Sequence, residues 1–181
     1  MTLTSTAVAP TVSGNGGNVG APTFQNFVMT YPMAASSSVS KGDFIKLADT
    51  AANTVSKMTA TTDTFLGIAN VNIDNTYKSD GVTAGAAGDK YVSVIRKGFA
   101  EVNGRVSASG PYDEPILINS PMYVCSGTIT TTDNGQCLTS ATDSGIGTKI
   151  VARSIDAVAA QTTTGLFKIS VYIDTLTNNL V

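Results

Sequence analysis

The sequence YVSVIRKGFAEV, residues Tyr91–Val102, decides the fold that we expect for this chain. Apolar and polar residues alternate along it, and it is rich in Val, Ile, Tyr and Phe, which is typical of a β-strand. Successive side chains of a strand point to opposite faces, so Val92 and Val94 are expected on one face and Ile95 on the other. We therefore predict a strand here, and the rest of the chain is interpreted outward from it.

Gly98 interrupts this alternation, which resumes at Phe99. A glycine inside a strand usually marks a bulge or a sharp bend, because it lacks a side chain to pack and loses much conformational entropy on folding. The pattern predicts one long, bent strand that serves two sheets or turns the corner of a barrel. A β-branched residue at this position is expected to cost roughly 1–3 kcal/mol if the backbone is bulged or has a positive φ.

The composition is compatible with a protein that packs tightly against neighbouring proteins, and equally with an ordinary β-protein. The chain has 181 residues, of which 13% are charged, and a net charge of −2; an average soluble protein has about 25% charged residues. A nucleic-acid partner is not expected, because no basic stripe is present. A membrane partner is not expected either, because no apolar run approaches the roughly 18 residues that a membrane span needs.

The residue types give no sign of catalysis. The chain contains no His, the commonest general base and metal ligand. Asp113-Glu114 is the one adjacent pair of carboxylates, and the neighbouring Gly and Pro residues indicate a solvated loop. Glycine is plentiful, but no phosphate-binding pattern appears. We expect no enzymatic activity, no cofactor and no metal site.

The two cysteines, Cys125 and Cys137, are expected to be buried thiols. A predicted strand at Thr128–Thr132 would place them on strands that are not neighbours, too far apart for the short Cβ–Cβ distance of a disulfide. A different strand order would allow the bond.

The N-terminal part of the chain differs from the rest. We predict an extended arm and linker over residues 1–40 and a head domain over residues 41–181. Residues 1–19 are rich in Thr, Ser, Ala, Gly and Asn, whereas residues 21–33 contain aromatic and Pro residues that need a partner surface. Two interpretations fit: a first strand docked on its own barrel, or an arm that docks on another subunit. The candidate contact residues are Pro22, Phe24, Phe27, Tyr31 and Pro32.

The remainder of the chain predicts an all-β fold of short strands. Turn signals such as Asn103-Gly104 separate these strands, and residues 74–89 form a long exposed loop. The predicted strands are Phe44–Ala48, Thr54–Met58, Phe65–Ile73, Ile116–Ile118, Met122–Cys125, Thr128–Thr132, Gln136–Thr139, Thr148–Ile155 and Leu166–Ile173.

The chain also contains an internal echo. The sequence MTATTDTFLG, starting at Met58, matches LTSATDSGIG, starting at Leu138, at four positions. Each follows a predicted hairpin and precedes an apolar strand. The match indicates two related units on either side of the central strand, as in a duplicated barrel, although a Thr-rich chain also produces such matches by chance.

Four segments together resemble the capsid decoration (cement) proteins of tailed phages. They are GDFIKL at 42–47, FLGIA at 65–69, GDKYVSVIRKGFAEV at 88–102 and SPMYVCSGTITT at 120–131. The resemblance implies a small β-barrel or β-tulip-like head with an extended N-terminal arm, often trimeric. It also implies the major capsid protein and further copies of the chain as partners, and a location on the outer capsid surface of a virion assembled in the host cytoplasm. It brings no catalytic residues. The loop at 75–88 and the insertion at 110–115 depart from the pattern.

Two other functions are compatible with an all-β chain. The first is a phage tail, baseplate or carbohydrate-binding adhesin module. Sugar platforms usually need exposed aromatic residues, and with no Trp the candidates are Tyr77 and Tyr112. The second is a single-strand nucleic-acid binder, which requires a basic groove and is disfavoured by the net negative charge.

Overall fold

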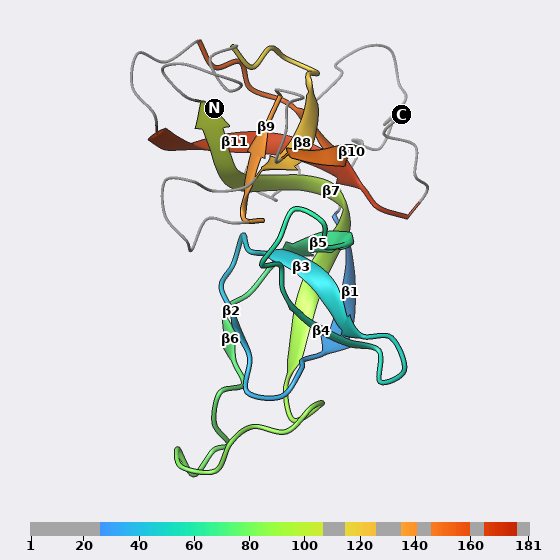
Figure 1. Ribbon diagram of the computed structural model, residues 1–181, viewed down its shortest axis with the longest axis vertical. Helices are drawn as coiled ribbons and strands as arrows, with labels where there is room; N and C mark the ends of the chain where they lie inside the picture. Colours follow the sequence, from blue (N-terminus) through green and yellow to red (C-terminus); the bar gives the residue numbers. More distant parts are fainter. Residues whose placement is uncertain (1–25, 107–114, 126–134, 141–145, 160–164, 177–181) are drawn as a thin grey trace, which may run out of the picture.

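The computed structural model describes residues 26–106, 115–125, 135–140, 146–159 and 165–176. These residues form an all-β fold without helices, built around a closed five-stranded barrel with additional strands (Figure 1). The strands are β1 (Phe27–Pro32), β2 (Ser38–Val39), β3 (Phe44–Asp49), β4 (Thr54–Lys57), β5 (Phe65–Ala69), β6 (Ile73–Asp74), β7 (Tyr91–Val106), β8 (Pro121–Cys125), β9 (Cys137–Thr139), β10 (Ile146–Ser154) and β11 (Gly165–Asp174).

Strand β7 is the long bent strand that the sequence predicts. It runs through the length of the molecule, from the lower part of Figure 1 into the upper part. Before Gly98 it pairs with β1 and β5, and from Lys97 onward it pairs with β11. Gly98 has a φ of +126°, a conformation that residues with a side chain rarely adopt. The bend therefore lets one strand serve two sets of partners.

The upper set of strands, which we call the second ring, is the closed barrel. Its strands follow the order β7, β11, β10, β8 and β9, and a parallel bridge between Gly104 and Leu138 joins β9 back to β7. Alternate residues of β11, from Ile169 to Ile173, point into its core and are buried, as the sequence predicts. The same core also contains Val102, Ile116, Met122, Val124, Leu138, Val151 and Ala152.

The lower set of strands, the first ring, is arranged in the same way. Its strands follow the order β1, β7, β5, β3 and β4. A parallel bridge between Met33 and Val55 joins β4 back to the end of β1, and the amide of Ala34 donates to the carbonyl of Val55 at 2.9 Å. The ring has its own core, formed by Tyr31, Met33, Val39, Ile45, Val55, Ala69, Val92 and Val94.

The two rings share one topology. When the five strands of each ring are numbered along the chain, their order around the ring is 1-5-4-2-3 in both. In both rings a parallel bridge joins the third strand back to the first. Strand β7 is the fifth strand of the first ring and the first strand of the second. The echo segments join equivalent strands, β4 to β5 and β9 to β10. This agreement favours duplication over a chance match.

The first copy of the echo forms a turn that an aspartate holds together. Asp63 accepts hydrogen bonds from the amides of Thr59 and Ala60, at 2.9 and 3.0 Å, and from the ammonium of Lys46 at 2.9 Å. Burial alone would raise the pKa of Asp63, but these hydrogen bonds outweigh it, so the pKa lies below its usual value. The corresponding Asp143 lies outside the described residues.

One buried glutamine connects the two rings. Gln136, next to β9, accepts a hydrogen bond from the amide of Phe44 at 2.7 Å. Its side-chain amide donates to the carbonyls of Phe44 and Met58, at 3.2 and 2.7 Å. Around it, Phe44, Met58, Ile68 and Ile95 belong to the core of the second ring although they lie in or next to strands of the first. The rings are therefore packed against each other.

Two details of the strand arrangement differ from the prediction. Asn103-Gly104 is not a hairpin turn: both residues lie in β7, opposite Lys168 and Phe167. A Cβ at Gly104 would lie 2.7 Å from the Phe167 ring, so this glycine permits close packing and not a turn. Cys125 and Cys137 are not on separated strands, because β8 and β9 are neighbours and place the two residues directly opposite each other. Both thiols are buried, as expected.

The folded body also begins earlier than the predicted boundary at residue 40. Strand β1 pairs with β7 along its whole length, and β2 pairs with β6. This corrects the boundary and favours the interpretation in which residues 27–32 are a first strand docked on its own barrel. The predicted strand at Thr128–Thr132 and residues 1–25 lie outside the described residues.

Candidate interaction surfaces

Strand β1 exposes three successive apolar side chains. Phe27, Val28 and Met29 are 49%, 39% and 37% exposed. Because neighbouring residues of a strand point to opposite faces, exposure at all three positions leaves both faces of β1 uncovered here. This surface, residues 27–29, is called the β1 patch below. Neighbouring exposed apolar side chains on a strand are a candidate interaction site.

The start of β1 is fixed by Asn26. Its side-chain carbonyl accepts from the amide of Phe99, and its side-chain amide donates to the carbonyl of Phe99, both at 2.8 Å. These two side-chain hydrogen bonds take the place of the backbone hydrogen bonds between paired strands. They extend the pairing of β1 with β7 by one residue. This arrangement is possible because Gly98 has no side chain: a Cβ there would lie 2.1 Å from the Asn26 side-chain oxygen. The β1 patch is thus held rigidly at the bend of β7.

The five predicted contact residues have different environments. Phe27 lies in the β1 patch, whereas Tyr31 is 7% exposed and belongs to the core of the first ring. The Tyr31 hydroxyl accepts a hydrogen bond from Arg96, whose guanidinium lies 6.0 Å from the ring centroid. Tyr31 is therefore a packing residue. Pro32 is half-buried, and Pro22 and Phe24 lie outside the described residues.

Met29 is absent from the predicted contacts although it is exposed. A signal was available in the sequence, since the run Phe27-Val28-Met29 lacks the alternation that a half-buried strand needs. Composition alone singled out the aromatic and Pro residues, and it cannot separate an exposed ring from a buried one.

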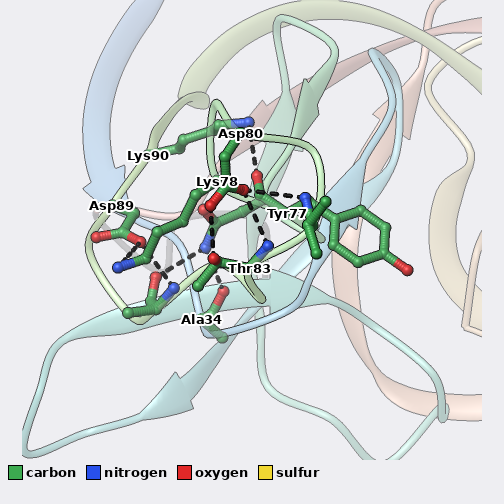
Figure 2. Close-up of polar contacts among 10 residues, drawn as sticks. Ala34, Tyr77, Lys78, Asp80, Thr83, Asp89 and Lys90 are labelled. Atoms are coloured by element: carbon green, nitrogen blue, oxygen red, sulfur yellow. Dashed lines mark hydrogen bonds and ion pairs between the residues drawn. The ribbon is translucent and has the colours of Figure 1, made fainter.

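The loop between β6 and β7, residues 75–90, forms an ordered projection at the end of the first ring (Figure 1). We call it the distal loop. Tyr77 forms an antiparallel bridge with Ala84, and the amide of Lys78 donates to the carbonyl of Thr83 at 2.7 Å. Asp80 accepts from the amides of Val82 and Thr83, both at 2.9 Å. Figure 2 shows this network and the Tyr77 ring pointing away from it.

The base of the distal loop is tied to the body. The buried Asn75 side chain donates to the carbonyls of Ala34 and Ala86, at 2.9 and 3.0 Å. Lys90 donates to the carbonyls of Asp74 and Tyr77. The loop is exposed, as the sequence predicts, but its hydrogen bonds make it a defined structure that presents Tyr77 and Val82.

Replacing Asp80 by Ala is expected to loosen the distal loop without changing global stability. The hydroxyl of Thr83 and the amides of Val82 and Thr83 hold the pKa of Asp80 below its usual value. The Asp80 carboxylate therefore orders the distal loop at pH values above the usual aspartate pKa of about 3.9. This order is lost as the pH falls through the lower pKa that Asp80 has in the folded protein. Hydrogen exchange at residues 78–83 is the measurement, and it should accelerate in the variant.

Asp49→Ala is the matched control, because Asp49 accepts from the amides of Ala51 and Ala52 in the β3–β4 turn. It should accelerate exchange in that turn and leave the distal loop unchanged. Unaltered exchange at residues 78–83 in the Asp80 variant would contradict the role given to this carboxylate.

A groove of about 500 Å³ lies where the rings meet. Its lining carries both signs of charge, from Lys41, Glu101 and Lys168.

Within the described ranges, no three His, Cys, Asp or Glu residues gather where they could hold a metal ion. The part of the chain that the structure describes also contains no helix long and apolar enough to span a membrane. The geometry of the described residues offers exposed surfaces for binding.

Comparison of the chain with protein-family models and with curated proteins finds no match. The relation to phage decoration proteins therefore stays a resemblance of sequence segments.

Proposed function

We propose that this protein is a capsid decoration protein that binds the outer surface of a tailed-phage head and stabilises it through contacts with the major capsid protein. The observation that carries the proposal is the β1 patch, with exposed apolar residues on a rigid strand next to the point where residues 1–25 join the body. The low charge of the chain supports it, because few ions need to be desolvated when the surface is covered.

In this proposal many copies act together. Each copy contributes a modest apolar contact, and self-association, with a homotrimer as the expected state, links several contacts into one binding event. Linked contacts bind far more tightly than single ones, because the second contact forms at a high effective concentration. The molecular mass in solution, measured by sedimentation, tests the trimer separately from binding to heads.

The double substitution Phe27→Ser and Met29→Ser is expected to weaken binding to heads by about tenfold or more, because interface apolar side chains contribute on the order of 1–2 kcal/mol each. Co-sedimentation with expanded heads, assembled from the major capsid protein of the same virus, measures the binding. Circular dichroism and the urea midpoint verify that the variant is folded.

A matched control is the double substitution Leu117→Ser and Ile118→Ser. These side chains are 61% and 70% exposed but lie on the second ring side of the molecule, near β10. The control should bind like the unmodified protein. If both double variants bind heads equally well, the β1 patch is not the contact surface. If the unmodified protein does not bind heads at all, the protein is not a decoration protein.

The alternative of a tail, baseplate or carbohydrate-binding module has one favourable observation, the exposed Tyr77 on the ordered distal loop. Aromatic rings that project from a rigid loop can stack on sugars. Binding of the protein to a glycan array, abolished by Tyr77→Ala, would favour this alternative over decoration.

A further inference from the structure

The second ring contains two thiols that face each other across one pair of strands. Cys125 is the last residue of β8 and Cys137 is the first residue of β9. The two are directly opposite in the antiparallel register, and both are fully buried. The thiol of Cys137 lies 3.8 Å from the carbonyl oxygen of Cys125. The fold therefore brings together the two sulfur atoms of a chain that has no other cysteine.

The backbone geometry suits a covalent bond between them. Residues opposite each other in an antiparallel pair have Cα atoms about 4.5 or 5.5 Å apart. Both values fall inside the range of roughly 4.4–6.8 Å that disulfides span. We propose that Cys125 and Cys137 form an intrachain cross-strand disulfide when the protein meets a low-molecular-weight disulfide such as oxidised glutathione. This inference does not depend on the proposed function.

The reaction consists of two thiol–disulfide exchanges. One cysteine thiolate attacks oxidised glutathione, whose S–S bond breaks, so that a mixed disulfide forms and one glutathione thiolate leaves. The second cysteine thiolate then attacks the protein sulfur of the mixed disulfide and expels the second glutathione. Two electrons pass from the protein sulfurs to glutathione, and the two thiol protons pass to the departing glutathione thiolates. No other reactant is needed.

The environment of the thiols makes this reaction slow in the intact fold. Hydrogen bonding with Cys137, together with burial, raises the pKa of the Cys125 thiol, so little of the reactive thiolate is present at neutral pH. The fold must open locally before the oxidant can enter. Strand β9 is the shortest strand of the second ring, with three residues paired to β8 and a single bridge to β7, so opening there breaks the fewest strand pairings. The pair is therefore stable as thiols until β9 opens.

The bond would fix β9 to β8 and close the segment between the two cysteines. Closing a loop of this length removes conformational entropy from the unfolded chain, and the resulting rise in Tm is expected to be about 5–10 °C.

The test exposes the unmodified full-length protein to oxidised glutathione at neutral pH, without urea and with urea below the unfolding transition. The expected product is a monomer whose mass is lower by about 2 Da, the two lost hydrogens, with a peptide that links Cys125 to Cys137. Its rate of formation should rise with urea, and its Tm should exceed that of the untreated protein. Treatment with dithiothreitol should reverse both changes.

Two variants serve as controls. Cys125→Ala should retain one glutathione on Cys137, because no second thiol is available to expel it, and the Cys125→Ala/Cys137→Ala variant should show no change in mass. Unchanged thiols in the unmodified protein at every urea concentration below unfolding would overturn the proposal. So would a persistent glutathione adduct, a linkage between two molecules, or a disulfide that lowers the Tm.

Discussion

Replacement of Gln136 by Ala is expected to destabilise the protein by roughly 3–5 kcal/mol, because it leaves buried backbone groups without partners and creates a cavity. The amide of Phe44 and the carbonyl of Met58 lose their hydrogen bonds to this side chain. The carbonyl of Phe44 is less affected, since it also accepts from the amide of Met58 at 2.8 Å. Urea unfolding measures the loss.

Two further substitutions separate the causes. Gln136→Met fills the same space without hydrogen bonds, so the part of the loss that it restores is due to the cavity. Asn72→Ala is the matched control, because that exposed amide side chain accepts from the amide of Lys41 at 2.7 Å and should cost no more than about 1 kcal/mol. If Gln136→Ala costs as little as the control, Gln136 does not hold the rings together.

Substitution of Gly98 by Val is expected to cost roughly 3–5 kcal/mol, more than the sequence alone suggested. Two penalties combine: the positive φ of +126° disfavours any side chain, and the new Cβ would lie 2.1 Å from the Asn26 side-chain oxygen and 2.9 Å from the Asn26 Cα. The Tm and the urea midpoint should both fall.

A double-mutant cycle distinguishes the two penalties. Gly98→Ala combined with Asn26→Gly removes the clash with the Asn26 side chain but keeps the backbone strain, so the double variant should be more stable than the sum of the single effects predicts. Additive effects, within about 0.5 kcal/mol, would mean that the contact between these residues contributes nothing.

The local pattern of the sequence was enough to predict the strands that it covers. The alternation in β7 assigns Val92 and Val94 to one face of the strand and Ile95 to the other, and in the structure these two faces pack into different cores. The same reasoning succeeds for Ile169, Val171 and Ile173 in β11. Such predictions succeed because a period of two fixes which side chains share a face, whatever the partner strand is.

Long-range pairing explains the predictions that failed. Asn103-Gly104 has the composition of a hairpin turn, but ten residues of β11 pair with β7 across it and override that local preference. The separation of the two cysteines was inferred from chain order, whereas β8 and β9 are neighbours in the sheet. Tyr31 was predicted as a docking residue because the neighbouring sequence does not show its partner. That partner is Arg96, 65 positions away, which donates to the Tyr31 hydroxyl.

The candidate site was predictable only in part for the same reason. The aromatic composition of residues 21–33 pointed to Phe27, but its exposure depends on which strands cover β1. Nothing near Gln136 in the sequence reveals that its amide satisfies backbone groups 92 and 78 positions away.

The sharing of β7 has a consequence for how the molecule can be divided. A cut between the rings removes a strand from one of them, because β7 belongs to the first ring and continues directly into the second. Neither half is an independent module, although each has its own core. We therefore expect the two rings to unfold together, because one continuous strand belongs to both.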